Sequence, residues 1–376
     1  MPDVVAICLP GGPAFVEALQ SVWAAGDAAF PVDTRLPDHE LARVMTTIAP
    51  TSIIEADGER RRLSAGHPAE PGDALVIATS GTTGMPKGVV HTHEAVTASA
   101  EATSSGLGVD PSNDRWLCCL PLGHIGGLSV VTRSIITGTP VDVHPRFDAT
   151  AVAEAATNGV TMVSLVTRAL TQIDPTAFRT ILLGGGPSPA DCPSNAVTTY
   201  GLTETGSGVV YDRLPLDGVE INIADDGEIW LRGPMLLRAY RQATGGGMLH
   251  ADPKDSEGWF ATGDMGDLDA EGRLAVHGRK GDVIVTGGEM VWPERAEQVL
   301  NRQPGISEAA IVGQPHPEWG QEVVAFVVPE GSGPHLGQLR EAVRSELPIW
   351  YAPRRVELVD ALPRTTLGKL QRSRLR

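Results

Sequence analysis

The segment ATSGTTGMPKGVVHTHEA, from Ala78 to Ala95, decides how this chain is interpreted. Its glycines allow tight backbone turns that bring N–H groups close to a ligand, its hydroxyl side chains add further donors, and Lys87 adds a positive charge. An apolar, β-prone run, DALVIATS, leads into it, and a helix-like run, HEAVTASAEATSS, ends it. We therefore expect a loop that joins a strand to a helix and cradles a phosphate-like anion.

This loop does not follow the Walker pattern G-x-x-x-x-G-K-[ST]. Met85 and Pro86 precede Lys87, and Gly88 stands where a serine or threonine belongs, so a conventional P-loop NTPase is disfavoured. The alternative is a flexible Gly/Ser surface turn. Such a turn rarely carries an ordered run of hydroxyls closed by Pro-Lys-Gly, so the pattern favours a functional loop.

Composition excludes several classes of protein. The chain has 376 residues, 41% hydrophobic and 20% charged, which is enough to bury the cores of two or three domains. A net charge of -16 argues against nucleic-acid or anionic-membrane partners. The four cysteines lack metal or disulfide-scaffold spacing, and no run resembles a signal peptide or a membrane span. We expect a cytoplasmic protein with reduced thiols.

The texture of the sequence changes along the chain. In the first 75 residues, and again in the middle, short apolar runs alternate with helical runs, which predicts an α/β architecture. From about Asp217 hairpin-like runs dominate, and after Trp292 helices and strands alternate in a small unit. We expect a large N-terminal domain (1–278) of helix-covered sheets with a β-rich subdomain. A hinge (279–282) and a small mobile α+β C-terminal domain (283–376) follow.

Five further motifs follow the opening loop in a fixed order: YGLTETG at 200–206, GEIWLRGP at 227–234, GWFATGDMGDLDAEGRL at 258–274, GRKGDVIVTGGEMVWPERAE at 278–297 and PRTTLGKLQR at 363–372. Together they resemble the core motifs of the adenylate-forming superfamily of acyl-CoA synthetases, adenylation domains and luciferases. The resemblance covers almost the whole chain. It implies a ligase that activates a carboxylic acid as acyl-AMP with ATP and Mg²⁺, and then transfers the acyl group to the co-substrate coenzyme A.

The resemblance implies a nucleotide-binding role for several residues. ATP and the acyl carboxylate are both anionic, so their charges must be neutralised and held in line. Glu204 would hold Mg²⁺, and Thr203 would contact the α-phosphate. Without the motif, Glu204 would be an ordinary solvated carboxylate. The remaining candidates are the loop residues and the residues near the adenine: Thr79, Ser80, Gly81, Thr82, Thr83, Gly84, Lys87, Gly184, Gly185, Gly186, Tyr200 and Gly201.

Residues near the C-terminus complete the implied site. Asp264 and Arg279 match the positions that hold the ribose hydroxyls, although a surface salt bridge would explain both equally well in isolation. Lys369 matches the lysine whose charge stabilises the adenylation transition state. The small domain would rotate about Gly281 between the two half reactions. Gly287 and Gly288 would then border the pantetheine channel, where the alternative is a simple hairpin turn.

The compact chain most resembles the o-succinylbenzoate-CoA synthetases of menaquinone biosynthesis, especially the actinobacterial forms. The segment LPLGHIGGLSVVTRSIITGTPV supports this resemblance. It places His124 at the position that, in these enzymes, faces the acyl substrate or gates the CoA channel. Gly123 replaces the usual aromatic residue, from which we expect a locally enlarged site. The alternative for His124 is a packed or capping histidine.

The implied substrate carries two carboxylates, so one residue should bind the carboxylate that does not react. Arg133 and Arg168 lie in apolar stretches and are the candidates, but either could reach the surface along a helix face. His91 and His93 form an H-x-H pair that suggests a metal, yet no third ligand has suitable spacing and helix-start polarity explains the pair as well.

Other functions stay open at this point. Within the family, the alternatives are a synthetase for another aromatic or short-chain acid and a stand-alone adenylation enzyme that loads a carrier protein. From a different class, a non-catalytic nucleotide-binding relative is conceivable. It is disfavoured because the implied charged residues are all present. Many relatives form dimers, so a homodimer is possible.

Overall fold

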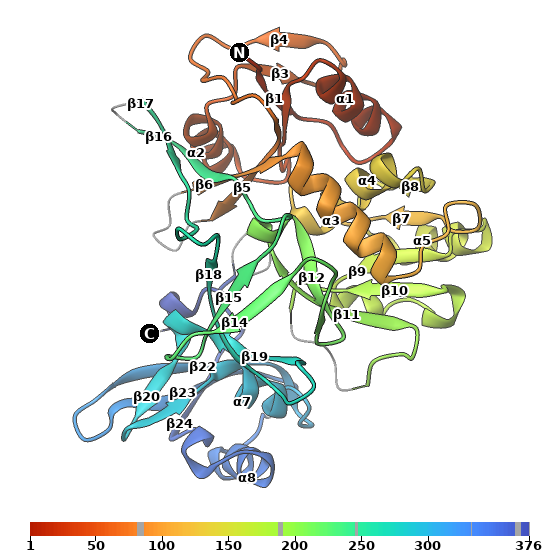
Figure 1. The fold of residues 1–376 in the computed structure, drawn as a ribbon. Coiled ribbons are helices and arrows are strands. Elements are labelled where there is room, and N and C mark those ends of the chain that lie inside the picture. Colours follow the sequence, from red (N-terminus) through yellow and green to blue (C-terminus); the bar gives the residue numbers. More distant parts are fainter. Residues whose placement is uncertain (81–85, 187–190, 245–246, 332, 365–369, 376) are drawn as a thin grey trace. The chain divides into compact units, whose positions relative to one another are not determined.

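The computed structural model describes residues 1–80, 86–186, 191–244, 247–331, 333–364 and 370–375. Contacts divide the chain into two compact units. Unit 1 comprises Met1–Ile221 and Leu231–Phe260, and unit 2 comprises Asn222–Trp230 and Ala261–Arg376. Both units combine helices with sheets (Figure 1), so the predicted α/β class is confirmed.

The first sheet of unit 1 has the strand order β17-β16-β6-β5-β2-β1-β3-β4. Its middle strands β5, β2, β1 and β3 run parallel, and antiparallel pairs flank them on both sides. Continuous apolar runs form β1 and β2, because both faces of these strands are buried. The bounds are β1 (Val4–Ile7), β2 (Ala28–Pro31), β3 (Ser52–Ile54), β4 (Arg60–Arg62), β5 (Asp73–Ser80), β6 (Pro86–Thr92), β16 (Ala239–Thr244) and β17 (Gly247–Ala251).

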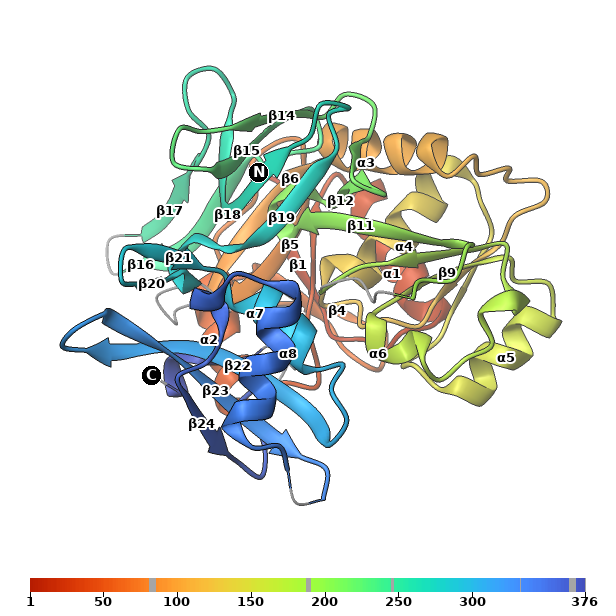
Figure 2. The ribbon, with the colours of Figure 1, turned by 90° about the horizontal axis from the view of Figure 1, so that it is seen from below.

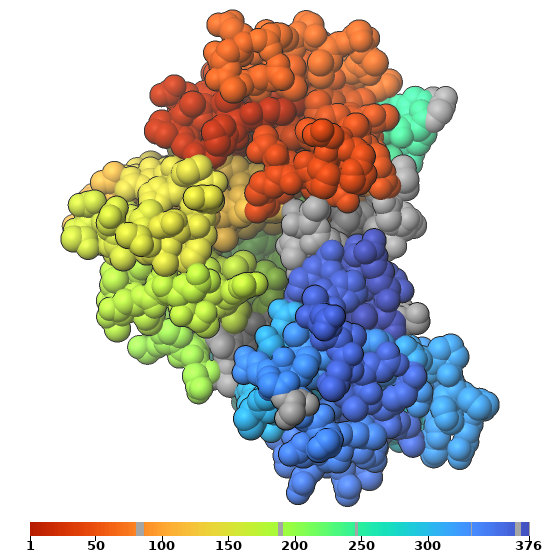
Figure 3. All heavy atoms as spheres, turned by 180° about the vertical axis from the view of Figure 1, so that it is seen from behind, coloured from red at the N-terminus to blue at the C-terminus, as the bar shows by residue number. Residues whose placement is uncertain are grey.

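The second sheet of unit 1 has the strand order β13-β12-β11-β10-β9-β7-β8. Strands β8, β7, β9, β10 and β11 are parallel, and β12 and β13 return antiparallel. The bounds are β7 (Trp116–Cys118), β8 (Val141–Val143), β9 (Met162–Leu165), β10 (Thr180–Leu183), β11 (Ala196–Leu202), β12 (Ser207–Tyr211) and β13 (Leu214–Pro215). In the space-filling view the yellow and green residues of this sheet and its helices lie beside the red and orange N-terminal residues (Figure 3).

Helices join the two sheets of unit 1. Helix α3 packs against β5 and β6 of the first sheet and against β12 of the second, and it lies beside α4 (Figures 1 and 2). Thr92 begins α3 by accepting a hydrogen bond from the N–H of Ala95 on its side-chain oxygen. The helices of unit 1 are α1 (Pro13–Ala24), α2 (Asp38–Ile48), α3 (His93–Gly106), α4 (Ile125–Thr137), α5 (Ala149–Thr157) and α6 (Thr167–Leu170), with short turns η1 (Pro175–Ala177) and η2 (Thr203–Thr205).

Unit 2 contains most of the sheet β14-β15-β18-β19 and a five-stranded sheet in which β23 pairs with β20, β22 and β24. The apolar faces of α7 and α8 pack on the second of these sheets around a core that includes Ile311, Val323 and Leu339. The strands are β14 (Glu220–Ile223), β15 (Glu228–Arg232), β18 (Phe260–Leu268), β19 (Leu274–Arg279), β20 (Ile284–Thr286), β21 (Glu289–Val291), β22 (Ile306–His316), β23 (Gly320–Pro329) and β24 (Arg355–Leu358). The helices and turns are η3 (Lys280–Asp282), α7 (Pro293–Leu300), α8 (Leu336–Glu346), η4 (Ile349–Tyr351) and η5 (Arg372–Arg374).

One local prediction was wrong. The predicted loop lies between two antiparallel strands, because β5 pairs with β6 and Thr79 lies opposite Lys87, which is itself in β6. The helix begins at His93, the first residue of the predicted helix-like run, but β6 lies between it and the loop. The stretch GVVHT was placed in the loop ahead of the helix-like run HEAVTASAEATSS, but its buried residues belong to β6 in the interior of the sheet.

The contact-based units do not coincide with the predicted domains, since part of the predicted β-rich subdomain groups with the C-terminal residues. The hinge at 279–282 remains a prediction. None of the described helices is both long and apolar enough to cross a membrane.

Candidate functional site

Three side chains of unit 1 meet at the end of the predicted phosphate loop. Lys87 Nζ, at the start of β6, lies 3.3 Å from Oε1 of Glu204 in the η2 turn. Tyr240, on β16, donates its hydroxyl to the same oxygen at 2.9 Å, and its ring centroid lies 3.4 Å from Lys87 Nζ. The fold therefore brings together the predicted phosphate-binding lysine and the predicted magnesium ligand, along with a tyrosine that sequence reasoning missed.

The turn that carries Glu204 is fixed by hydrogen bonds. The N–H of Leu237 donates to the Glu204 carbonyl at 2.8 Å, and Thr205 Oγ1 donates to the Ser207 carbonyl at 2.6 Å. His91 lies 2.7 Å from the Thr203 carbonyl through Nε2. A carbonyl only accepts, so Nε2 carries the proton. Burial lowers the pKa of His91 to about 4, which keeps the ring neutral at pH 7.

The other residues of the same motif shape the approach to this turn. Tyr200 and Gly201 lie on β11 at a register shift against β12. A Cβ at Gly201 would lie 2.3 Å from the Ser207 carbonyl oxygen, so only glycine fits this close approach of two backbones. Thr203 opens η2, and its carbonyl is the acceptor for His91.

The described residues fit a magnesium–nucleotide complex of the predicted kind. Mg²⁺ usually keeps several waters and binds one or two carboxylates along with phosphate oxygens, so the single carboxylate of Glu204 suffices. No group of three or more His, Cys, Asp or Glu residues in the described ranges could form a separate all-protein metal site. The two histidines of the H-x-H pair have different surroundings. His91 is buried against Thr203, whereas the ring of His93 packs edge-on against Trp23.

Several predicted loop residues lie outside the described residues: Gly81, Thr82, Thr83, Gly84 and Lys369. Thr79 and Ser80 are the last residues of β5, directly before that gap. The Thr79 hydroxyl lies 3.5 Å from the Lys87 carbonyl, at the limit of a hydrogen bond. The described residues on either side of 81–85 are the paired ends of β5 and β6.

The glycines proposed to lie near adenine follow β10 directly. A Cβ at Gly184 would lie 2.6 Å from Thr199 Oγ1, and Gly185 has a left-handed φ of 81°. Both positions therefore favour glycine for local reasons. Around Gly186 no described atom would lie within 4 Å of an added Cβ.

His124 is held by an aspartate that sequence reasoning missed. Its Nε2 lies 3.1 Å from Oδ2 of Asp33, which also accepts two hydrogen bonds of 2.8 Å from the Arg35 side chain. Burial alone would raise the pKa of Asp33, but the hydrogen bonds from Arg35 and His124 hold it well below its ordinary value. His124 is the N-cap residue of α4, but its side chain makes no capping hydrogen bond and is directed to Asp33 instead.

The expected enlargement at Gly123 is also wrong. A Cβ at Gly123 would lie 2.8 Å from both the backbone nitrogen and the Cβ of Asp33. The main chain around Asp33 occupies the space next to Gly123, so the glycine permits a close approach of two segments and leaves no extra room.

The two candidate arginines lie in different environments. Arg133, on α4, is 1% exposed, so the surface alternative is wrong for this residue. Its guanidinium lies 4.7 Å from the ring centroid of Trp116, and Nη2 lies 3.5 Å from Ser207 Oγ. Nε and Nη1 have no hydrogen-bond partner among the described residues. Arg168, on α6, is exposed, as the surface alternative expected.

In unit 2, Asp264 and Arg279 lie directly opposite each other on β18 and β19. Arg279 Nε is 2.7 Å from Oδ1 of Asp264, and the aspartate side chain is 7% exposed against 51% for the arginine. The predicted ribose-binding pair is therefore a cross-strand ion pair with one buried member.

The predicted hinge and channel glycines also lie in unit 2. Gly281, in η3, has no left-handed φ, and no described atom would lie within 4 Å of an added Cβ, so this conformation does not require glycine. Gly287 and Gly288 have φ of 59° and 87° and form the turn between β20 and β21, as the hairpin alternative expected. A Cβ at Gly287 would lie 2.9 Å from the Trp319 ring.

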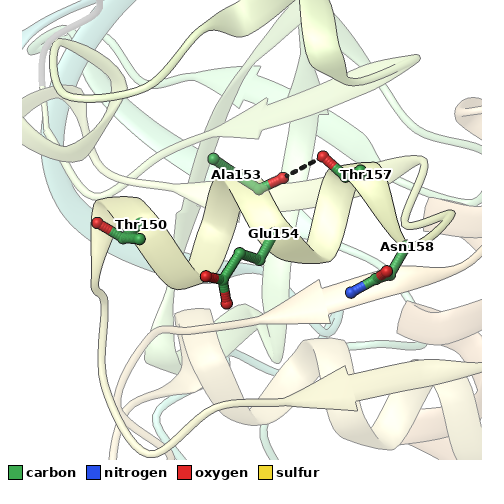
Figure 4. Close-up of a pocket in the computed structure, with 5 residues that line it drawn as sticks. All are labelled: Thr150, Ala153, Glu154, Thr157 and Asn158. Carbon is green, nitrogen blue, oxygen red and sulfur yellow. Dashed lines mark hydrogen bonds between the residues drawn. The ribbon is translucent and has the colours of Figure 1, made fainter.

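A hollow of about 290 Å³ on the surface of α5 does not involve the predicted site (Figure 4). One helix and the residue that follows it supply its lining, and Thr157 Oγ1 donates to the Ala153 carbonyl beside it at 3.0 Å. The lining residues are Thr150, Ala153, Glu154, Thr157 and Asn158, none of which is a predicted site residue.

Two family models match the chain: the AMP-binding enzyme model over residues 59–241 and the model of the AMP-binding enzyme C-terminal domain over residues 295–369. The 2-succinylbenzoate–CoA ligase of Listeria monocytogenes serotype 4b (strain F2365) is 35% identical over 90% of this chain and 77% of its own length. The chain belongs to the AMP-binding enzyme family. This confirms the resemblance to the adenylate-forming enzymes.

Further relatives agree. A probable 2-succinylbenzoate–CoA ligase of Mycobacterium tuberculosis (strain H37Rv) is 39% identical over 80% of this chain and 83% of its own length. The o-succinylbenzoate-CoA synthetase (MenE) of Bacillus subtilis, solved in complex with its acyl-adenylate intermediate, has a TM-score of 0.87 and 30% identity. That match covers 100% of this chain and 88% of the solved chain. The same enzyme in complex with ATP and magnesium has a TM-score of 0.86 and 30% identity.

Proposed function

We propose that this protein is an ATP-dependent acid–thiol ligase that converts o-succinylbenzoate to o-succinylbenzoyl-CoA through an acyl-AMP intermediate. The observation that carries the proposal is the meeting of Lys87 and Glu204 at the end of the predicted phosphate loop, 3.3 Å apart. A cation for phosphate oxygens and a carboxylate for a metal are the two charges that a magnesium–triphosphate complex needs. The names of these relatives, which are o-succinylbenzoate–CoA ligases, support the choice of acid.

The reaction has two displacements at one site. In the first, the acyl carboxylate attacks the α-phosphate of ATP and pyrophosphate leaves. In the second, the CoA sulfur attacks the acyl carbon, its proton is released, and AMP leaves. The ammonium of Lys87 would neutralise charge on the phosphates, and Thr203 would contact the α-phosphate.

Magnesium would be held by Glu204 and would neutralise the charge of the pyrophosphate that departs. The residues around Glu204 hold its carboxylate in place before the reaction begins, at the position where the phosphates would bind. Roles for Asp264 and Arg279 at the ribose, for the glycines 184–186 at the adenine, and for Lys369 in the transition state remain predictions from the resemblance.

Arg133 is the better candidate for the carboxylate that does not react. Its guanidinium is buried, and two of its three nitrogens lack protein partners among the described residues, so it can accept an anionic ligand without losing a protein bond. Arg168 is exposed, where a carboxylate would compete with water for its charge. The Asp33–His124 pair would border the acyl group, with Asp33 fixing the orientation of the imidazole.

The test is a product assay with purified protein, ATP, Mg²⁺, CoA and a panel of acids. We expect AMP, pyrophosphate and o-succinylbenzoyl-CoA, and loss of all three when EDTA removes the metal. Turnover of benzoate or of a fatty acid without turnover of o-succinylbenzoate would contradict the choice of acid. Transfer of the acyl group only to a carrier protein would favour the stand-alone adenylation enzyme. If no acid yields AMP, the alternative of a non-catalytic nucleotide-binding protein would be favoured.

Lys369→Ala separates the two half reactions. We expect loss of acyl-AMP formation, while thioester formation from supplied acyl-AMP is largely kept, because the charge of the lysine acts on the phosphates. An unchanged adenylation rate would remove Lys369 from the mechanism. A cytoplasmic location, the hinge at 279–282 and a homodimer belong to the same proposal.

A further inference from the structure

Tyr240 contacts both charged groups of the candidate phosphate and metal site. It lies on β16 opposite Val89 of β6, two residues after Lys87. Its hydroxyl donates to Glu204 Oε1 at 2.9 Å, and its ring centroid lies 3.4 Å from Lys87 Nζ. One side chain thus contacts an anion through its polar end and a cation through its aromatic face.

The backbone of the turn that carries Glu204 is already held by hydrogen bonds, so only the side chain of Glu204 remains to be positioned. The carbonyls of Thr203 and Glu204 are held at 2.7 Å by His91 and at 2.8 Å by the N–H of Leu237. These bonds fix the backbone of the turn but not the direction of the Glu204 carboxylate, which hangs on several rotatable bonds. Among the described residues, the Glu204 carboxylate contacts Tyr240 and Lys87, and these contacts set its direction.

We propose that Tyr240 is a positioning residue that presents the Glu204 carboxylate to the metal and the Lys87 ammonium to the phosphates. The inference rests on the proposed function, which assigns those ligands to Glu204 and Lys87. The hydroxyl occupies one lone pair of Oε1 and leaves the remaining lone pairs of the carboxylate for a metal. Partners of this kind orient a metal ligand without touching the metal, and their loss typically weakens metal binding by tenfold or more.

The ring performs a separate task. Without the aromatic face, the flexible lysine side chain would have many rotamers available and would approach Glu204 more freely, since opposite charges at this distance attract. With the ring in place, the ammonium is held over an aromatic surface from which it can turn toward a phosphate. Two variants separate the tasks: Tyr240→Phe removes the hydroxyl and keeps the ring, and Tyr240→Leu removes both.

The experiment is calorimetric binding of ATP, without acid, in excess Mg²⁺ and in EDTA. The ratio of the two dissociation constants measures the metal contribution and requires no turnover. For Tyr240→Phe we expect the metal contribution to fall by about tenfold, with binding in EDTA changed less than about twofold. For Tyr240→Leu we expect the same fall, plus a loss of about threefold in EDTA because Lys87 is no longer held.

A matched control is Tyr211→Phe. Tyr211 is buried, and its hydroxyl bonds to Thr103 Oγ1 at 3.1 Å, so the same chemical group is removed from a bond that does not involve Glu204. We expect its metal contribution to equal that of the wild type. A double-mutant cycle keeps the proposal falsifiable even if Tyr240→Phe lowers stability, since Tyr240→Phe should have no further effect on the metal contribution in a Glu204→Gln background.

The outcomes distinguish failure of the positioning role from failure of the proposed function. If the wild type gains affinity from Mg²⁺ and Tyr240→Phe gains equally, the positioning role is wrong while the proposed function stands. If Tyr240→Phe gains more than the wild type, the hydroxyl competes with the metal and the proposal is overturned. If the wild type does not bind ATP, or gains nothing from Mg²⁺, both the proposed function and the inference fail.

Discussion

Two arginines of unit 1 are each 1% exposed, but their surroundings differ. Arg241, on β16, donates to four main-chain carbonyls, among them Ile48 at 3.0 Å and Pro68 at 2.8 Å. Arg133 contacts the face of Trp116 and, at the limit of a hydrogen bond, Ser207. Burial lowers the pKa of Arg241 to about 10 and lowers that of Arg133 as well, but a guanidinium remains protonated at neutral pH.

The surroundings of the two buried guanidinium groups indicate different roles. Arg241 meets the carbonyls of Ile48 and Ala49 at the end of α2, where the last turn of a helix leaves acceptors without partners and the helix dipole favours a cation. Its bonds are all internal, which is the pattern of a structural residue. Two nitrogens of Arg133 lack a partner among the described residues, and such a deficit costs free energy unless a ligand supplies the acceptor.

Arg241→Met is the strongest test of this contrast. The variant leaves several carbonyls without a donor, so we expect the free energy of unfolding to fall by about 4 kcal/mol. Urea denaturation measures this change. Arg168→Met, at an exposed arginine, is the control and should stay within about 0.5 kcal/mol of the wild type. A loss below about 1 kcal/mol for Arg241→Met would mean that the carbonyls find other partners.

Arg133→Met should lower activity without lowering the free energy of unfolding, in contrast to Arg241→Met. Arg133 has no ion-pair partner among the described residues, so replacing this buried charge by an apolar side chain of similar length should leave the free energy of unfolding unchanged or raise it by about 1 kcal/mol. We expect kcat/KM for o-succinylbenzoate to fall about 100-fold, equivalent to about 2.7 kcal/mol. Steady-state kinetics with an analogue that lacks the non-reacting carboxylate supplies the control, because that analogue should lose nothing. Equal losses for both acids would exclude a carboxylate contact.

Arg133→Lys sharpens the same contrast. Lysine keeps the charge but loses the planar fork, so we expect a fall of about tenfold in kcat/KM for the dicarboxylate, between the wild type and Arg133→Met. The measurement is the same kinetic comparison of the two acids. Activity equal to that of the wild type would show that charge alone is recognised.

Ser207→Ala should have the smallest effect. The contact between Ser207 Oγ and Arg133 is 3.5 Å long, which is weak for a hydrogen bond. We expect changes of about 0.5 kcal/mol or less in the free energy of unfolding and of less than about twofold in kcat/KM. A loss as large as that of Arg133→Met would show that Ser207 itself binds the substrate.

Much of the fold could be read from the sequence, but the connection at the opening loop could not. Short apolar runs such as VVAI predicted buried strands, and periodic runs such as FVEALQSVWA predicted helices, since both patterns depend on local spacing. The stretch PKGVVHT was placed in the loop, because so short a run after a glycine-rich segment does not distinguish a strand from a loop by its pattern alone. The pairing of Val89 with Ile77 decides between them, and that contact is not local.

The residues of the candidate site could likewise be predicted from the sequence only in part. Motifs identified Lys87 and Glu204, but Tyr240 lies 36 residues beyond Glu204 in a segment with no signal of its own apart from alternation within a strand. Asp33 was missed for a similar reason, since it precedes His124 by 91 residues and looked like an ordinary turn aspartate. Gly123 was read as added space, and only the position of Asp33 showed that the space is filled.

By itself, the sequence determined the chemistry of this protein: which charged and hydroxyl groups are available, in which order, and therefore which family of reactions they suit. Motif residues are close in sequence, so their spacing carries the information directly. The tertiary structure decided which of these groups meet, which neighbours orient them, and which buried arginine has its donors satisfied. Those facts depend on contacts between segments far apart in the chain, where packing and hydrogen bonding select one arrangement that no local pattern specifies.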